Sequence, residues 1–112
     1  GSRVASPPPQ APEAAASSEL GRALSDAIEA YHQGEFSEAR SALGTLRLPL
    51  LESGSTAQRR ALLEHLLLVH AAFDEVDLAC QSLAELRGYL EDPALDPEFF
   101  SPKVLELSAS CP

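Results

Sequence analysis

Apolar residues recur at three- and four-residue steps along most of this chain, the spacing that places side chains on one face of an α-helix. The first stripe starts at Leu20, after a serine suited to cap a helix, and stops at Gly34. A second stripe starts at Ala39, and Pro49 is expected to end its helix because proline lacks the backbone donor that the helix needs. The pattern predicts two antiparallel helices over residues 19–48.

A second hairpin is predicted over residues 56–91, after a loop rich in serine and glycine. Thr56 is suited to cap its first helix, in which leucines are too dense to face water on one side only. This helix is expected to be the most buried element. A tight turn is predicted at Asp74, and the helix after it is expected to end before Pro93, since the residue preceding a proline disfavours helical geometry.

The flanks of the two hairpins have different compositions. Residues 1–18 are rich in proline and alanine without apolar periodicity, which predicts a disordered tag and linker. Ser101 and Pro102 supply an N-cap and a first-turn proline for a short capping helix over 101–110. The predicted fold is therefore all-α, with about five helices in a domain over 19–112.

Composition narrows the classes of partner. The 112 residues carry 8 basic and 17 acidic side chains, a net charge of -9, so binding to a nucleic-acid backbone is not expected. Aromatic residues make up only 5% of the chain, which favours helix packing over an all-β core. No apolar run reaches the ~20 residues that a membrane-spanning helix requires.

The two predicted hairpins repeat each other at an offset of 40 residues. Small residues in the second helix of each unit allow two helices to approach closely, and an apolar residue after each turn is expected to plug the hairpin. The positions that carry the repeat are Ala27, Gly34, Phe36, Ala39 and Leu43 in the first unit and Val76, Ala79 and Leu83 in the second. This pattern resembles the tetratricopeptide repeat, although the offset exceeds the ~34 residues usual in that family.

The resemblance implies a right-handed stack of hairpins whose concave groove binds a protein or peptide. The first helix of each hairpin lines the groove in that family, and the corresponding residues here are Leu24, Ile28, Tyr31, His32, Glu64, Leu68 and Ala71. None is basic, so a clamp for a terminal carboxylate is not expected, and apolar contacts would hold the partner. The alternatives are a structural or oligomerisation domain whose groove is filled by its own chain or a second copy, and a small thiol–disulfide switch.

The segment from Asp96 to Val104 resembles the closing segment of short repeat arrays in cell-envelope proteins of Gram-negative bacteria. This resemblance implies a periplasmic or envelope location, with the cytoplasm as the alternative. Phe99 and Phe100, within this segment, are expected to cover the open end of the stack.

Two cysteines lie at matching depths of the predicted fold. Cys80 is ten residues before the connection to the last helix and Cys111 is nine residues into that helix, so both lie ~14 Å from the connection and can form a disulfide. The alternative is that Cys80 is a small buried residue and that Cys111 frays at the end of the chain.

Catalytic and metal-binding patterns are not found in the sequence. It holds no glycine-rich phosphate loop and no nucleophile with a plausible base, so we expect neither an enzyme nor a cofactor. His65 and His70 are five residues apart, about 140° around a helix, so they cannot share one metal ion. The acidic runs after residues 73 and 90 either steer a basic partner or are solvated surface.

Overall fold

The computed structural model describes residues 11–92 and 94–112, with side chains from Ser18 onward. Within that part the chain forms five helices and no strand, so the predicted all-α class is confirmed. The helices are α1 (Ala11–His32), α2 (Phe36–Ser53), α3 (Thr56–Ala72), α4 (Val76–Arg87) and α5 (Pro102–Ala109). Residues 1–10 of the predicted linker, and Pro93, lie outside the described residues.

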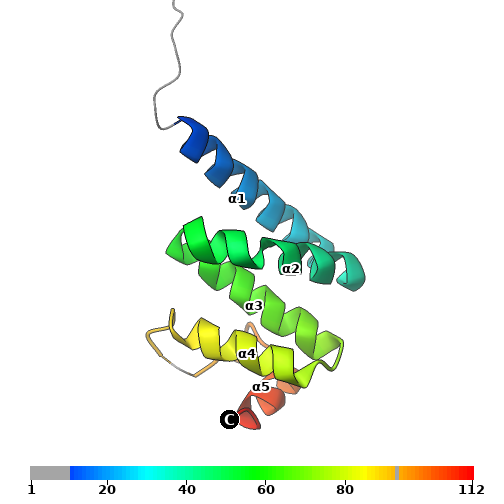
Figure 1. The fold of residues 1–112 in the computed structure, drawn as a ribbon. Helices are drawn as coiled ribbons and strands as arrows, with labels where there is room; N and C mark the ends of the chain where they lie inside the picture. Colours follow the sequence, from blue (N-terminus) through cyan, green and yellow to red (C-terminus); the bar gives the residue numbers. More distant parts are fainter. Residues whose placement is uncertain (1–10, 93) are drawn as a thin grey trace, which may run out of the picture.

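The helices stack in chain order from α1 to α5 (Figure 1). The helices α1 and α2 form one hairpin, and α3 and α4 form the second. The first helix of the second hairpin packs on both helices of the first, and α5 in turn packs on both α3 and α4. The capping helix therefore takes the place that the first helix of a third hairpin would occupy.

The two interhelical turns have the same hydrogen bonds at an offset of 40 residues. The N–H of Glu35 donates to the carbonyl five residues before it at 2.9 Å, and the N–H of Glu75 does the same at 2.8 Å. The residue before each donor has a left-handed backbone, with φ of 83° at Gly34 and 58° at Asp74. This is the Schellman arrangement that closes many helices. Glycine adopts it freely and aspartate tolerates it better than most residues, which explains both turns.

The helix α2 continues through Pro49 to Ser53, so the predicted stop at Pro49 and the predicted loop over 49–56 are wrong. Leu50, which is fully buried, extends the apolar stripe of α2 by a further turn. Burying a leucine contributes ~1.5–3 kcal/mol, comparable with the cost of about 3 kcal/mol for proline inside a helix. The hydroxyl of Ser53 also donates to the carbonyl of Pro49 at 2.9 Å.

The helix α3 is capped by Ser55, one residue earlier than the predicted Thr56. The backbone N–H of Gln58 donates to the Ser55 hydroxyl at 3.1 Å, and the Gln58 side chain accepts from the Ser55 N–H at 2.9 Å. This reciprocal pair is a capping box, which satisfies two N–H groups at once and so favours Ser55 over its neighbour.

Three other helix boundaries can be set against the boundaries that the sequence predicts. The helix α1 begins at Ala11, well before residue 19, because alanines favour helix and a proline in the first turn loses no hydrogen bond. The helix α4 ends at Arg87 instead of near Leu90. The predicted start of α5 is confirmed, since the Ser101 hydroxyl accepts from the N–H of Val104.

The helix α3 is the centre of the core, as the density of leucine predicts. Its buried residues are Leu62, Leu63, His65, Leu66, Leu67, Leu68, Val69 and Ala71. Neighbours on both sides of the stack cover this helix, so its apolar residues extend around most of its circumference.

Ion pairs connect the second turn to the helices on either side of it. Glu75 accepts from the Nε of Arg40 on α2 at 2.9 Å, and one of its oxygens lies 2.9 Å from the Nδ1 of His70 on α3. These two contacts, the arginine first, lower the pKa of Glu75 below its ordinary value. Asp74 pairs with Lys103 of α5 at 3.0 Å. Two of the acidic residues, Asp74 and Glu75, therefore form contacts with basic side chains of the same domain.

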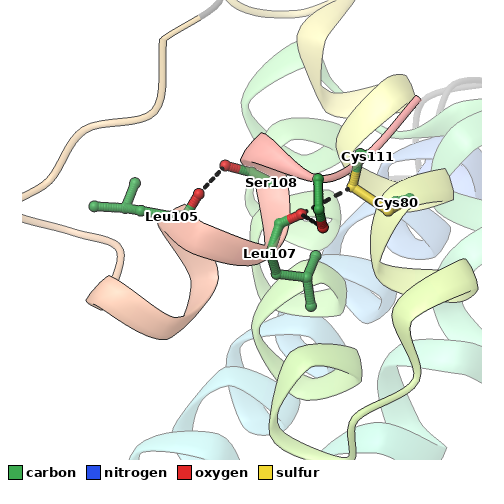
Figure 2. Close-up of a disulfide and its surroundings, with 6 residues drawn as sticks. Cys80, Leu105, Leu107, Ser108 and Cys111 are labelled. Carbon is green, nitrogen blue, oxygen red and sulfur yellow. Dashed lines mark hydrogen bonds between the residues drawn. A yellow bond between two sulfur atoms is a disulfide. The ribbon is translucent and has the colours of Figure 1, made fainter.

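A disulfide fixes the capping helix to the second hairpin. Cys80 lies in α4 and Cys111 lies directly after α5, their sulfur atoms are at bonding distance, and their Cα atoms are 5.5 Å apart (Figure 2). The prediction that the two cysteines meet is confirmed. Phe100 and Val104, both nearly fully buried, attach the same end of the chain to the core.

Candidate functional site

The predicted groove residues separate into a buried and an accessible group. The buried group belongs to the hydrophobic core and consists of Leu24, Leu68 and Ala71. The accessible group consists of Ile28, Tyr31 and Glu64, which are half-buried, and His32, which is exposed. The buried three stabilise the fold and offer little surface to a partner, so binding at this face would depend on the other four.

The residues that carry the repeat are mostly core residues. Those that are buried are Ala27, Ala39, Leu43, Ala79 and Leu83. Phe36 and Val76, which the sequence predicts to plug the hairpins, are 40% and 48% exposed, so each is covered only in part. Each is the first residue of its helix, at the end of a hairpin where little chain covers it. The ring of Phe36 lies against that of Tyr31 on α1, the other helix of its hairpin, with 5.2 Å between centroids.

Three aromatic side chains, those of Tyr31, His32 and Phe99, meet around the ring of His65, and we call these four side chains the ring cluster. The centroid of the His65 ring lies 5.9 Å from Tyr31, 5.8 Å from His32 and 6.0 Å from Phe99. The rings meet edge to face, the arrangement that aromatic quadrupoles favour. Helices α1 and α3 and the connection between α4 and α5 are thus joined at one point.

His65 has one satisfied and one unsatisfied nitrogen. Its Nδ1 lies 2.7 Å from the carbonyl oxygen of Ala61, which can only accept, so Nδ1 carries the proton. Its Nε2 is buried and receives no hydrogen bond from any residue in the described part of the chain. Burial lowers the pKa of His65, although the hydrogen bond to Ala61 opposes this effect, so the surroundings favour the neutral ring. A buried acceptor therefore lacks a donor.

Beside the ring cluster lies a hollow of about 600 Å³ between α3 and the connection that follows α4. We call it the acidic hollow. Its apolar wall includes Leu90, Leu95 and Phe99, and Phe99 also belongs to the ring cluster. Its carboxylates are Glu64, Glu91, Asp92 and Asp96. The basic side chain among its lining residues, Arg60, lies 3.3 Å from Glu64.

The connection around the hollow is shaped by two aspartates. Asp92 accepts from the N–H of Ala94 at 3.0 Å, and Asp96 accepts from the N–H of Glu98 at 2.9 Å. Such turns, in which an Asp or Asn side chain accepts from the backbone two residues on, fix the local path of a chain. The two carboxylates are therefore held at the rim of the hollow by the backbone that they organise.

Comparisons of the chain with protein-family models, with curated proteins and with solved structures give no match. In residues 11–92 and 94–112, no helix combines the length and the apolar character needed to cross a membrane. In the same described residues, no three His, Cys, Asp or Glu side chains lie close enough together to hold a metal ion.

Sequence reasoning finds only part of this face. The repeat places Tyr31, His32 and Glu64 there, but the counterpart of His65 in the first hairpin is a serine, so the repeat gives no indication of a histidine at this point. The spacing of four residues between Arg60 and Glu64 is a usable signal for their ion pair. The return of Phe99 to α3 has no such signal, because the connection shows no periodicity.

Proposed function

We propose that this chain is a non-enzymatic protein-interaction domain built from two tetratricopeptide-like hairpins and a cap, within a larger bacterial protein of the cell envelope. The observation that supports this proposal is the repetition of the two Schellman turns at an offset of 40 residues, with the next helix in contact with both helices of each hairpin. Stacked hairpins of this kind offer an extended surface for a partner. Here that surface holds the ring cluster and the acidic hollow.

The disulfide supports the envelope as the location. Disulfides persist in oxidising compartments such as the bacterial periplasm and are rare in the cytosol. The Cys80–Cys111 bond joins the cap to the second hairpin, so the end of the stack depends on it. A periplasmic domain stabilised in this way fits the closing segment of envelope repeat proteins that the tail resembles.

A second candidate function is a structural domain whose groove is filled by its own chain. The observation that favours it is the contact of Phe99 with His65, because the connection after α4 brings its own ring to the face where a partner would bind. In this case the ring cluster serves packing, and the exposed part of the face joins a second copy of the chain.

Site-specific photo-crosslinking distinguishes the two candidates. A photoreactive phenylalanine analogue replaces His32, which is exposed at the ring cluster, and in a matched variant it replaces Thr45, which is exposed on α2. Both variants are expressed in the full-length bacterial protein and irradiated in cells. We expect a crosslink to a different protein at position 32 that is several times stronger than at position 45.

Sedimentation of the purified domain over a range of concentrations completes the test. A monomer at every concentration, with the crosslink at position 32, supports an interaction domain. A crosslinked dimer of the chain, together with a mass that rises with concentration, supports the structural domain instead. Equal crosslinking at the two positions contradicts both, because neither candidate places a partner on the outer side of α2.

A further inference from the structure

We infer that the acidic hollow binds a basic segment of the partner protein, one that carries lysine or arginine next to an apolar side chain. This inference rests on the proposed interaction function and adds the chemistry of the partner. The charge and the shape of the hollow support it, and a buried polar atom without a partner lies in the ring cluster beside the hollow.

The charge of the hollow is one-sided. Four carboxylates, of Glu64, Glu91, Asp92 and Asp96, surround it, and the guanidinium of Arg60 is already paired with the first of these. The whole chain has the same sign, with a net charge of -9. A concave surface that carries one sign of charge attracts the opposite sign and raises the rate of association.

The wall of the hollow suits a peptide better than a small cation. Leu90, Leu95 and Phe99 offer apolar surface between the carboxylates, and the volume of about 600 Å³ is within the range of ligand pockets. A metal ion would require at least three converging ligands, and no such group occurs in the described residues. A segment that alternates basic and apolar side chains satisfies both the carboxylates and the apolar wall.

His65 gives the independent indication that this face lacks a partner. The residue is 94% buried, and its Nε2 is an acceptor without a donor in the described part of the chain. His65 itself does not line the hollow, but its ring meets that of Phe99, which does, with 6.0 Å between the centroids. Burying such a group without a partner destabilises the folded chain.

The experiment uses the whole chain and three fluorescein-labelled nonapeptides. The first alternates lysine and leucine, the second has glutamate in place of lysine, and the third has serine in place of leucine. Fluorescence anisotropy measures binding of each peptide at low and at physiological salt. We expect binding of the lysine–leucine peptide only, weakened by salt, together with shifts in the NMR resonances of the Phe99 and His65 rings.

Two double variants test whether binding occurs at the hollow. Asp92→Asn with Asp96→Asn removes two charges there, and asparagine preserves both turns. Asp26→Asn with Glu38→Gln removes two charges from a second acidic depression, between α1 and α2. We expect the first pair to weaken binding about tenfold and the second pair to change it less than twofold.

Each other result overturns the inference. Equal weakening in the two double variants shows general attraction to an acidic protein, and equal binding of the three peptides shows that basic charge is not recognised. Absence of binding to all three peptides also contradicts a basic, apolar partner. None of these results decides the proposed function, because the crosslink at position 32 detects a partner of any charge.

Discussion

Removing the disulfide should lower the free energy of unfolding by an amount that can be calculated from the length of chain it closes. The bonded residues are 31 positions apart. The loss of loop-closure entropy for such a loop corresponds to ~3.7 kcal/mol at 25 °C. A domain of this size has a total stability of only about 5–15 kcal/mol, so the bond contributes a large share. The double variant Cys80→Ser with Cys111→Ser should therefore unfold far more easily.

The assay is urea unfolding followed by circular dichroism, with the free energy compared instead of the midpoint alone. A cross-link keeps the unfolded chain compact, so its removal exposes more surface on unfolding and steepens the transition. We also expect the melting temperature to fall by about 15 °C or more. Hydrogen exchange at α5 should accelerate most, because only Val104 and its neighbours then hold this helix to the core.

Reduction of the wild-type protein provides the matched control. Wild type in a reducing agent and the double serine variant should have the same stability, and the variant should not respond to the agent. A loss below about 1 kcal/mol in both would refute the reasoning, since it would mean that the unfolded chain gains little freedom when the loop opens. A loss of stability in the serine variant, but not in the reduced wild type, would show that the effect comes from replacing the cysteines with serine and not from opening the loop.

Three further predictions concern the turns, the helix contacts and acid stability. In thermal unfolding, Gly34→Ala should lower stability by about 1–2 kcal/mol, because the backbone at this position is left-handed with φ of 83°. Asp74→Gly should leave stability unchanged or raise it, because glycine adopts the left-handed backbone of this position freely. An equal loss in the two variants would contradict this reasoning. Ala79→Leu should lower the free energy of unfolding, measured in urea, by ~1–3 kcal/mol, because this alanine is fully buried. The control Ala84→Leu, at an exposed position of α4, should have little effect. Similar losses in the two variants would count against a close helix contact at Ala79. The contacts of Glu75 lower its pKa, so the stabilisation that they give is present above the ordinary pKa of 4.5 and is lost as the pH falls through the lowered value. In unfolding curves measured over a series of pH values, Glu75→Gln should therefore reduce the loss of stability at acid pH. An unchanged loss at acid pH would contradict this role of Glu75.

The sequence predicts the parts of the fold that depend on local chemistry. Gly34 and Asp74 identify both turns because few residues accept a left-handed backbone, and Ser101 identifies the start of α5 because its side chain caps it. The depth of the two cysteines also follows from helix rise alone. Pro49 misleads because the cost of a proline is local, whereas the burial of Leu50 that offsets it comes from neighbouring helices.

The candidate site is harder to predict because tertiary packing decides it. Leu68 belongs to the groove in the repeat pattern, yet it lies in the core, because the register of a helix does not tell how closely the next one packs. His65 and Phe99 meet only through the path of the connection after α4, which follows no period. Periodicity predicts which residues lie on the same face of a helix. Which other segments pack on that face depends on the path of the whole chain.

The position of the disulfide also determines how the domain responds to tension. A pull applied at Pro112 passes through Cys111 directly into the middle of α4, so α5 and the connection before it carry no load. The 31 residue steps between the cysteines stay hidden from extension, which removes roughly 105 Å of contour length from a stretched chain. Under force the cap should lengthen only after the bond is reduced.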